Sequence, residues 1–77
     1  MDTQTEIPNE VKIALIQNEI ALHKNTSYQL QLRHRVNKKL GGSAEELKAL
    51  QDEMVKHEQA IEILNEELKA LDEQKSN

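Results

Sequence analysis

Cysteine, phenylalanine and tryptophan are absent from this 77-residue sequence, and Tyr28 is its one aromatic residue. Without cysteine, the chain has no disulfide framework, no thiolate nucleophile and no cysteine-ligated metal site. Without large aromatic side chains, a closed globular core is difficult to fill. These absences argue against a disulfide-stapled domain and against a thiol enzyme.

Long hydrophobic runs are missing as well. No stretch approaches the roughly 20 apolar residues that a membrane-spanning helix needs. The N-terminal segment, residues 1–8, lacks the basic start and apolar run of a signal peptide. We therefore expect a soluble protein of a reducing compartment and predict that it is cytoplasmic.

Glycine occurs only at positions 41 and 42 and proline only at position 8, so the chain has few points at which a helix must end. Apolar residues make up 36% of the sequence and charged residues 31%. Leu, Ile, Glu, Lys, Ala and Gln dominate, as in long helices. One chain of this size buries little surface alone, so we expect it to self-associate.

An apolar repeat at alternating steps of three and four residues runs from Leu47 to Leu71. This is the spacing of the a and d positions of a coiled coil, sustained over about three and a half heptads. Every member is apolar except His57. The repeat predicts a helix–helix seam through Leu47, Leu50, Met54, His57, Ile61, Leu64, Leu68 and Leu71.

Helix-boundary signals surround the two glycines. Gly41 follows Leu40 at a position suited to a helix C-cap, because glycine adopts left-handed dihedral angles without steric cost. Ser43 and Glu46 have the spacing of a capping box, which starts a second helix. So short a connection makes the two helices antiparallel neighbours. We predict an all-α fold, a coiled-coil-like two-helix antiparallel hairpin that dimerises into a four-helix bundle.

The predicted domain organisation follows from these boundaries. A flexible arm covers residues 1–8, and Asn9 is the expected N-cap of the first helix. The first helix covers about 10–40, the turn 41–43 and the second helix about 44–73. Residues 74–77 form a frayed tail.

The first predicted helix carries apolar residues on two sides. We assign one side to the seam with the second helix, through Leu15, Leu22, Gln29, Leu32, Val36 and Leu40. If Leu40 faces Leu47, residues whose numbers sum to about 87 lie opposite each other, and Gln29 falls beside His57. A buried Gln–His pair would satisfy both side chains and oppose slipped registers.

The second apolar side contains Ile13, Ile16 and Ile20, nearly opposite the first. A helix that is apolar on two sides must meet two neighbours. We predict that this ridge, with Ile63 from the second helix, forms an interface. A homodimer is the favoured occupant, and a different partner protein is the alternative.

Positive charge gathers near the predicted turn, at Arg33, Arg35, Lys38 and Lys39, with no acidic residue between positions 23 and 40. A basic tip of this kind could contact nucleic-acid phosphates. The alternative is a solvated face that complements the helix dipole and the acidic second helix. The shortage of stacking aromatic residues and the net charge of −4 both argue against nucleic acid.

His57 either sets the seam register or acts as a pH switch, because a histidine charged below about pH 6.5 would place a cation in the seam. Glu53 lies four residues before it, a spacing that suits a metal ligand pair, but no second ligand cluster is in reach. We predict no metal site and no cofactor.

No glycine-rich phosphate loop and no catalytic constellation is visible, so we expect no enzymatic activity and no small-molecule substrate. The predicted function is that of a small interaction protein, a scaffold, adaptor or structural element that acts through helix–helix contact. One alternative is an RNA- or ribosome-associated hairpin that uses the basic tip. Another is a small helical chaperone for an apolar client helix.

Overall fold

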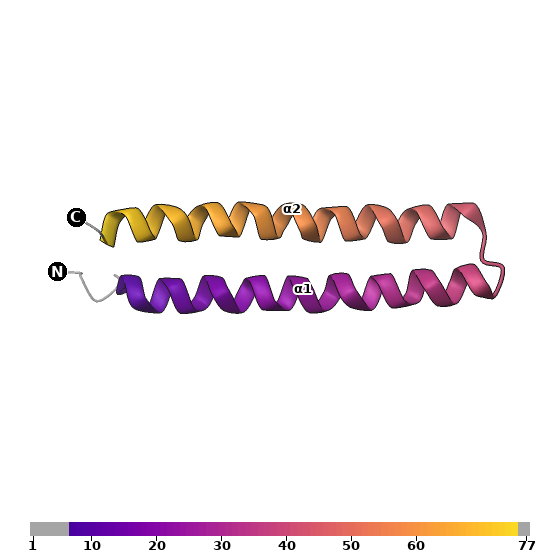
Figure 1. The fold of residues 1–77 in the computed structure, drawn as a ribbon, viewed down its shortest axis with the longest axis horizontal. Coiled ribbons are helices and arrows are strands. Elements are labelled where there is room, and N and C mark those ends of the chain that lie inside the picture. The colour runs from indigo at the N-terminus through magenta and orange to yellow at the C-terminus, as the bar shows by residue number, and fades with distance from the viewer. Residues whose placement is uncertain (1–6, 76–77) are drawn as a thin grey trace.

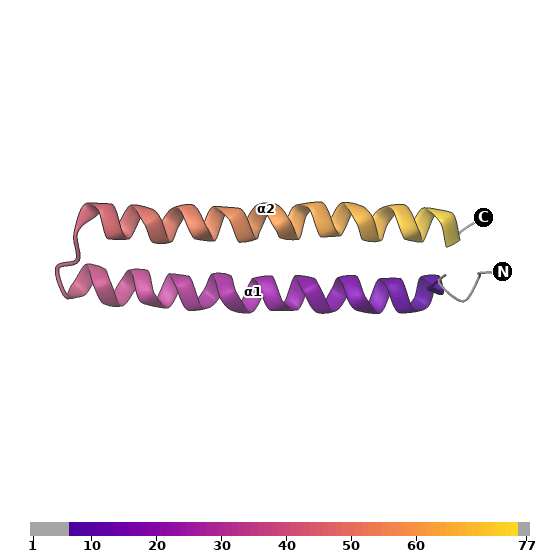
Figure 2. The same cartoon turned by 180° about the vertical axis from the view of Figure 1, so that it is seen from behind.

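Two long helices and one short turn make up the part of the chain that the computed structural model describes, residues 7–75 (Figure 1). Helix α1 spans Asn9–Lys39 and helix α2 spans Ala44–Lys75. Figures 1 and 2 show the helices side by side along their whole length, with the start of α1 and the end of α2 at the same end. The protein is therefore an antiparallel helical hairpin, as the short connection predicted.

The helix boundaries differ from the predicted ones by one or two residues. Helix α1 covers Asn9–Lys39 instead of about 10–40, and α2 continues through Lys75 instead of ending near Glu73. Residues 1–6 of the predicted arm and residues 76–77 of the predicted tail lie outside the described residues. Between residues 7 and 75, neither helix contains an 18-residue stretch apolar enough to cross a membrane.

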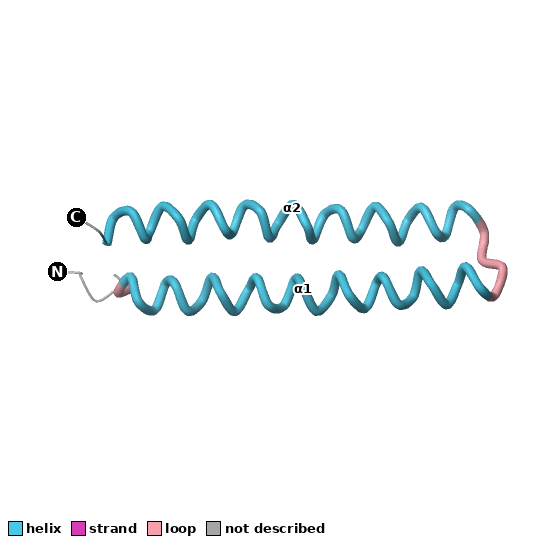
Figure 3. The backbone as a smooth tube through the Cα atoms, in the orientation of Figure 1, coloured by secondary structure: helices cyan, strands magenta, loops and turns pink. Residues whose placement is uncertain are grey.

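A C-terminal capping motif ends α1 at the turn, which Figure 3 shows as the loop between the helices. Gly41 adopts a φ of 82°, in the left-handed region that glycine reaches without steric cost. Its amide donates to the Lys38 carbonyl at 3.2 Å, and the Gly42 amide donates to the Asn37 carbonyl at 2.6 Å. These two bonds form a Schellman motif, which satisfies carbonyls that the helix itself leaves unpaired.

A capping box starts α2 directly after this motif. The Glu46 amide donates to Ser43 Oγ at 3.1 Å, and the Ser43 amide donates to Glu46 Oε1 at 3.2 Å. The predicted reciprocal pair is therefore confirmed. Because both caps are formed within a few residues, the turn fixes how α2 leaves α1.

The start of α1 differs from the prediction, because Pro8 and not Asn9 is the N-cap. The Pro8 carbonyl accepts the amides of Val11 and Lys12, both at 3.0 Å. Pro8 has extended backbone angles, with φ −58° and ψ 149°. Proline has no amide hydrogen to satisfy, so it is tolerated at this helix boundary and lets the helix begin at the next residue.

The inner face of α2 follows its heptad repeat. Leu71 is buried, and the other seven residues of the repeat are half-buried. Most of the remaining residues of α2 are exposed. The structure thus places Leu47, Leu50, Met54, His57, Ile61, Leu64, Leu68 and Leu71 on the side of α2 that faces α1.

The inner face of α1 is not the predicted one. Its half-buried and buried positions follow heptad steps through Ile13, Ile16, Ile20, His23, Ser27, Leu30, His34 and Asn37. The residues predicted to form this half of the seam are exposed: Leu15, Leu22, Gln29, Leu32, Val36 and Leu40. The assignment of the two sides of α1 was therefore wrong.

The register of the hairpin also differs from the prediction by about one heptad. His23 Nδ1 lies 2.8 Å from His57 Nδ1, so His57 pairs with His23 and not with Gln29. Leu30 and Leu50 line one groove between the helices. The residue numbers in each of these pairs sum to 80, against the predicted 87.

Two physical factors oppose the predicted arrangement. A seam through the predicted face would enclose the side chains of Asn18 and Asn25, and a buried amide without a partner costs about 1–3 kcal/mol. The capped turn adds a constraint that apolar periodicity does not contain, because it fixes the direction in which α2 starts.

The seam encloses few residues completely. Ile20, Leu30 and Leu71 are its buried apolar residues, and among residues 7–73 no large side chain is fully enclosed. Most residues of both helices therefore remain in contact with water.

Candidate functional site

A second heptad-spaced stripe runs along the outside of α1, nearly opposite the seam. We call it the outer stripe, and it consists of Val11, Leu15, Asn18, Leu22, Asn25, Gln29, Leu32 and Val36. All eight residues are exposed, and the exposed fractions of its five aliphatic residues range from 40% to 55%. Apolar residues at this spacing on a helix normally face another helix, so the outer stripe is the candidate interaction surface.

The predicted interface ridge is placed differently. Ile20 is buried, and Ile13 and Ile16 are half-buried, on the face of α1 that packs against α2. These three isoleucines therefore form part of the hairpin core and are not available to a second protein. The second apolar face of α1, which is exposed in the hairpin, is therefore the outer stripe and not the isoleucine ridge.

Ile63, the fourth residue of the predicted interface, is exposed on α2 with 61% of its surface accessible. Leu40 is 80% exposed at the C-cap of α1, next to the turn. Neither residue belongs to the outer stripe. Both add isolated apolar surface to a hairpin that already exposes most of the leucines of α1.

A histidine pair occupies the middle of the seam. The two Nδ1 atoms lie 2.8 Å apart, and the ring centroids of His23 and His57 lie 5.0 Å apart at an interplanar angle of 47°. One ring must donate and the other must accept, because two protonated rings would point two donors at each other. Sequence reasoning missed His23 because it had placed the seam on the other side of α1.

The one polar residue in the otherwise apolar repeat of α2, His57, predicts a structural role for this pair. A hydrogen bond that forms at one register only disfavours slipped pairings. Ser27, one helical turn further along α1, is buried beside this layer. The centre of the seam is therefore more polar than the end that contains the isoleucines.

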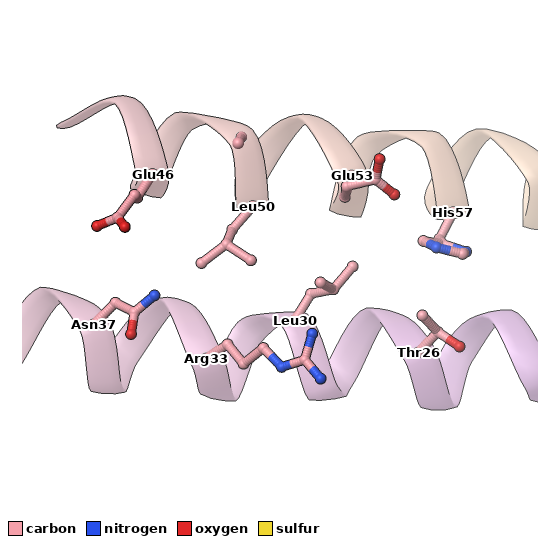
Figure 4. A pocket seen from close by; sticks show the side chains of 9 residues that line it. Thr26, Leu30, Arg33, Asn37, Glu46, Leu50, Glu53 and His57 are labelled. Atoms are coloured by element: carbon pink, nitrogen blue, oxygen red, sulfur yellow. The ribbon is translucent and has the colours of Figure 1, made fainter. Parts of the chain in front are cut away.

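A shallow groove lies between the helices on the turn side of this pair (Figure 4). It has a volume of about 570 Å³, and its lining includes Leu30 and Leu50. In Figure 4 the Leu30 and Leu50 side chains extend into the space between the helices. Arg33, Glu46 and Glu53 lie around them. The groove is open and its rim carries both signs of charge, which gives no convergent set of groups for catalysis.

The predicted basic tip is exposed. Arg33, Arg35, Lys38 and Lys39 all lie on the surface near the turn. Within residues 7–75, none of these four side chains forms an ion pair with α2. The expected neutralisation of the basic segment by the acidic second helix is therefore not realised through direct contacts.

The described residues contain no cluster of the side chains that bind metals. Between residues 7 and 75, no three histidine, aspartate or glutamate side chains converge on one point.

Comparison with protein-family models, with curated proteins and with solved structures finds no match to this chain. Its function therefore has to be inferred from its surface.

Proposed function

We propose that this chain is a small, non-enzymatic, cytoplasmic interaction protein that works by helix–helix association through the outer stripe of α1. The observation that carries the proposal is the exposure of five aliphatic residues at coiled-coil spacing along one helix. Complete burial of a fully exposed Val or Leu side chain contributes about 1.5–3 kcal/mol, and covering the half that is still exposed here contributes roughly half of that for each residue. A stripe of this length can therefore supply the affinity of a stable helix–helix contact.

The character of the stripe fits association better than hairpin folding. It lies away from α2, so its aliphatic residues contribute little to the seam. Contiguous exposed apolar surface on a small protein usually marks an interaction site. The three amides within it, those of Asn18, Asn25 and Gln29, remain hydrated in the hairpin and can find partners in an interface.

The experiment replaces two leucines of the stripe by aspartate and measures solution mass by light scattering on a sizing column. We expect Leu15→Asp with Leu22→Asp to lower the mass of the wild-type assembly while far-ultraviolet circular dichroism stays helical, because both residues are exposed in the hairpin. If the wild-type chain is monomeric, the variant and the wild-type chain are compared in their binding to a partner protein, and the variant should bind it less well.

A matched control introduces two carboxylates away from the stripe. Val55 and Gln59 are exposed on α2, so Val55→Asp with Gln59→Asp makes the same change in charge and also removes an exposed aliphatic residue. This control should leave association intact. Association that is unaffected by the stripe variant would contradict the proposed function.

Nucleic-acid binding by the basic tip is a second candidate, favoured by the exposure of four cations that form no ion pair with α2. Binding of this kind should fall steeply with salt, because it depends on the release of counterions from phosphates. Arg33→Glu with Arg35→Glu should abolish it. A fluorescently labelled RNA that shows no salt-dependent shift in anisotropy with the wild-type chain would exclude this candidate.

A further inference from the structure

Charge is divided between the two ends of the hairpin. The half next to the turn, residues 24–56, holds seven cations and four carboxylates, a net charge of +3. The other half, residues 9–23 and 57–73, holds two cations and eight carboxylates, a net charge of −6. Two hairpins side by side in the same direction would align like charges, whereas opposite directions would align opposite charges.

The outer stripe has its polar residues in the middle and aliphatic residues towards both ends. Asn25 lies one residue from the midpoint of α1, whose bounds are Asn9–Lys39. A two-fold axis through Asn25 therefore gives two antiparallel α1 helices nearly complete overlap. The numbers of facing residues then sum to 50, so Asn25 lies opposite its own equivalent and Leu15 lies within one residue of the level of Val36 of the second copy.

The flank of the stripe carries a complementary charge pair in this arrangement. Glu19 and Arg33 are both exposed beside the stripe, and the two-fold axis brings each close to the other's equivalent on the second copy. In the parallel arrangement Glu19 and its equivalent lie at the same level but on opposite flanks of the interface, so Glu19 and Arg33 do not meet and this charge pair is lost. A parallel dimer would also place aliphatic residues opposite aliphatic residues. Charge is therefore the feature that favours the antiparallel direction over the parallel one.

We propose that the outer stripe is occupied by a second copy of this chain, with its α1 antiparallel to the first and with Asn25 of both copies at the two-fold axis. The inference rests on the proposed function and names the partner. The order of the helices across this four-helix assembly is α2, α1, α1, α2. The asparagine pair at the centre contributes to fixing register and direction, as polar residues do in coiled coils.

The surface of the hairpin is large enough for such a dimer. The chain as a whole exposes 6175 Å², and a standard interface covers about 800 Å² on each partner. An interface of standard size would therefore cover about an eighth of that surface.

Because the chain has no cysteine, single cysteines report the arrangement directly. Asn25→Cys should form an interchain disulfide in a glutathione redox buffer, since the two positions meet at the axis. Val11→Cys should not, because its two copies lie about 42 Å apart along the helices. A mixture of Val11→Cys and Lys39→Cys chains should form crosslinked heterodimers. Gln59→Cys, exposed on the far side of the hairpin, gives the level of collisional crosslinking.

The possible outcomes separate this inference from the proposed function. Crosslinking of both Asn25→Cys and Val11→Cys would mean a parallel dimer, which overturns the inference and leaves the stripe as the interface. A monomeric wild-type chain would also overturn the inference, with the stripe left for a different partner. A wild-type dimer in which Asn25→Cys crosslinks no better than Gln59→Cys would overturn the inference. If Leu15→Asp with Leu22→Asp also leaves that dimer intact, the proposed function is overturned as well.

Discussion

The two faces of α1 carry residues at the same heptad spacing, yet one is enclosed and the other is exposed. The inner face places Ile13, Ile16 and Ile20 against α2 and continues through a polar layer at His23. The outer face has a similar number of aliphatic residues, interrupted by two asparagines and a glutamine. The difference teaches that apolar content alone does not decide which face of a helix meets its neighbour, because the pairing of polar residues also enters the free energy.

The largest expected effect is a difference in stability between variants of the inner and outer faces of α1, at two residues that are close in sequence. Ile20 is 8% exposed and Leu22 is 55% exposed. Ile20→Ala should remove about 2–5 kcal/mol from the free energy of unfolding, enough to unfold a marginal domain. Leu22→Ala should change the stability of the monomeric hairpin by less than about 0.5 kcal/mol.

Urea unfolding followed by circular dichroism measures both variants, at a concentration at which the chain is monomeric. Leu22→Ala then reports on the hairpin alone, and at higher concentration it reports on association as well. Equal losses of stability for the two variants would mean that the faces of α1 are not distinguished as the structure places them.

The contrast between α1 and α2 explains which parts of the fold could be predicted from the sequence alone. Helix α2 has one strong apolar stripe, so the period from Leu47 to Leu71 identified its inner face without further information. The two glycines with Ser43 and Glu46 identified the turn, because their caps depend on local spacing. The hairpin and its direction followed from these features.

Helix α1 could not be assigned in the same way, because it has two stripes and periodicity ranks them almost equally. The outer stripe contains more large aliphatic residues, and counting them favoured the wrong face. The deciding contact, between His23 and His57, depends on a register that the capped turn sets. In the predicted seam, Asn18 and Asn25 had no polar partner on the second helix. This mismatch was the signal that could have excluded the outer face from the seam.

An intermediate effect is expected from the histidine pair of the inner face. His57→Leu should cost about 1–3 kcal/mol, because it leaves a half-buried His23 nitrogen without a hydrogen-bond partner. His23→Leu with His57→Leu replaces both partners by apolar groups and should recover most of that loss. Chemical denaturation of the two single variants and the double variant forms the cycle. Additive losses would show that the two rings are not coupled.

The smallest effect concerns charge beside the outer stripe. Glu19→Arg alone and Arg33→Glu alone should each weaken dimerisation a few-fold at low salt, because exposed ion pairs contribute only about 0–1 kcal/mol each. Combining the two substitutions exchanges the charges and should restore the wild-type dissociation constant. Sedimentation equilibrium at low and high salt measures all three variants. A double variant that is weaker than either single variant would argue against the antiparallel arrangement.

The central claim, that α1 turns its isoleucine face and not its leucine face towards α2, is tested most directly by an intrachain disulfide. His23→Cys with His57→Cys should close such a bond in dilute solution, because these positions face each other across the seam. Gln29→Cys with His57→Cys should not, because Gln29 is exposed on the outer stripe. Closure of the second pair and not the first would contradict the account, because it would mean that α1 is rotated and that its leucine face lies in the seam.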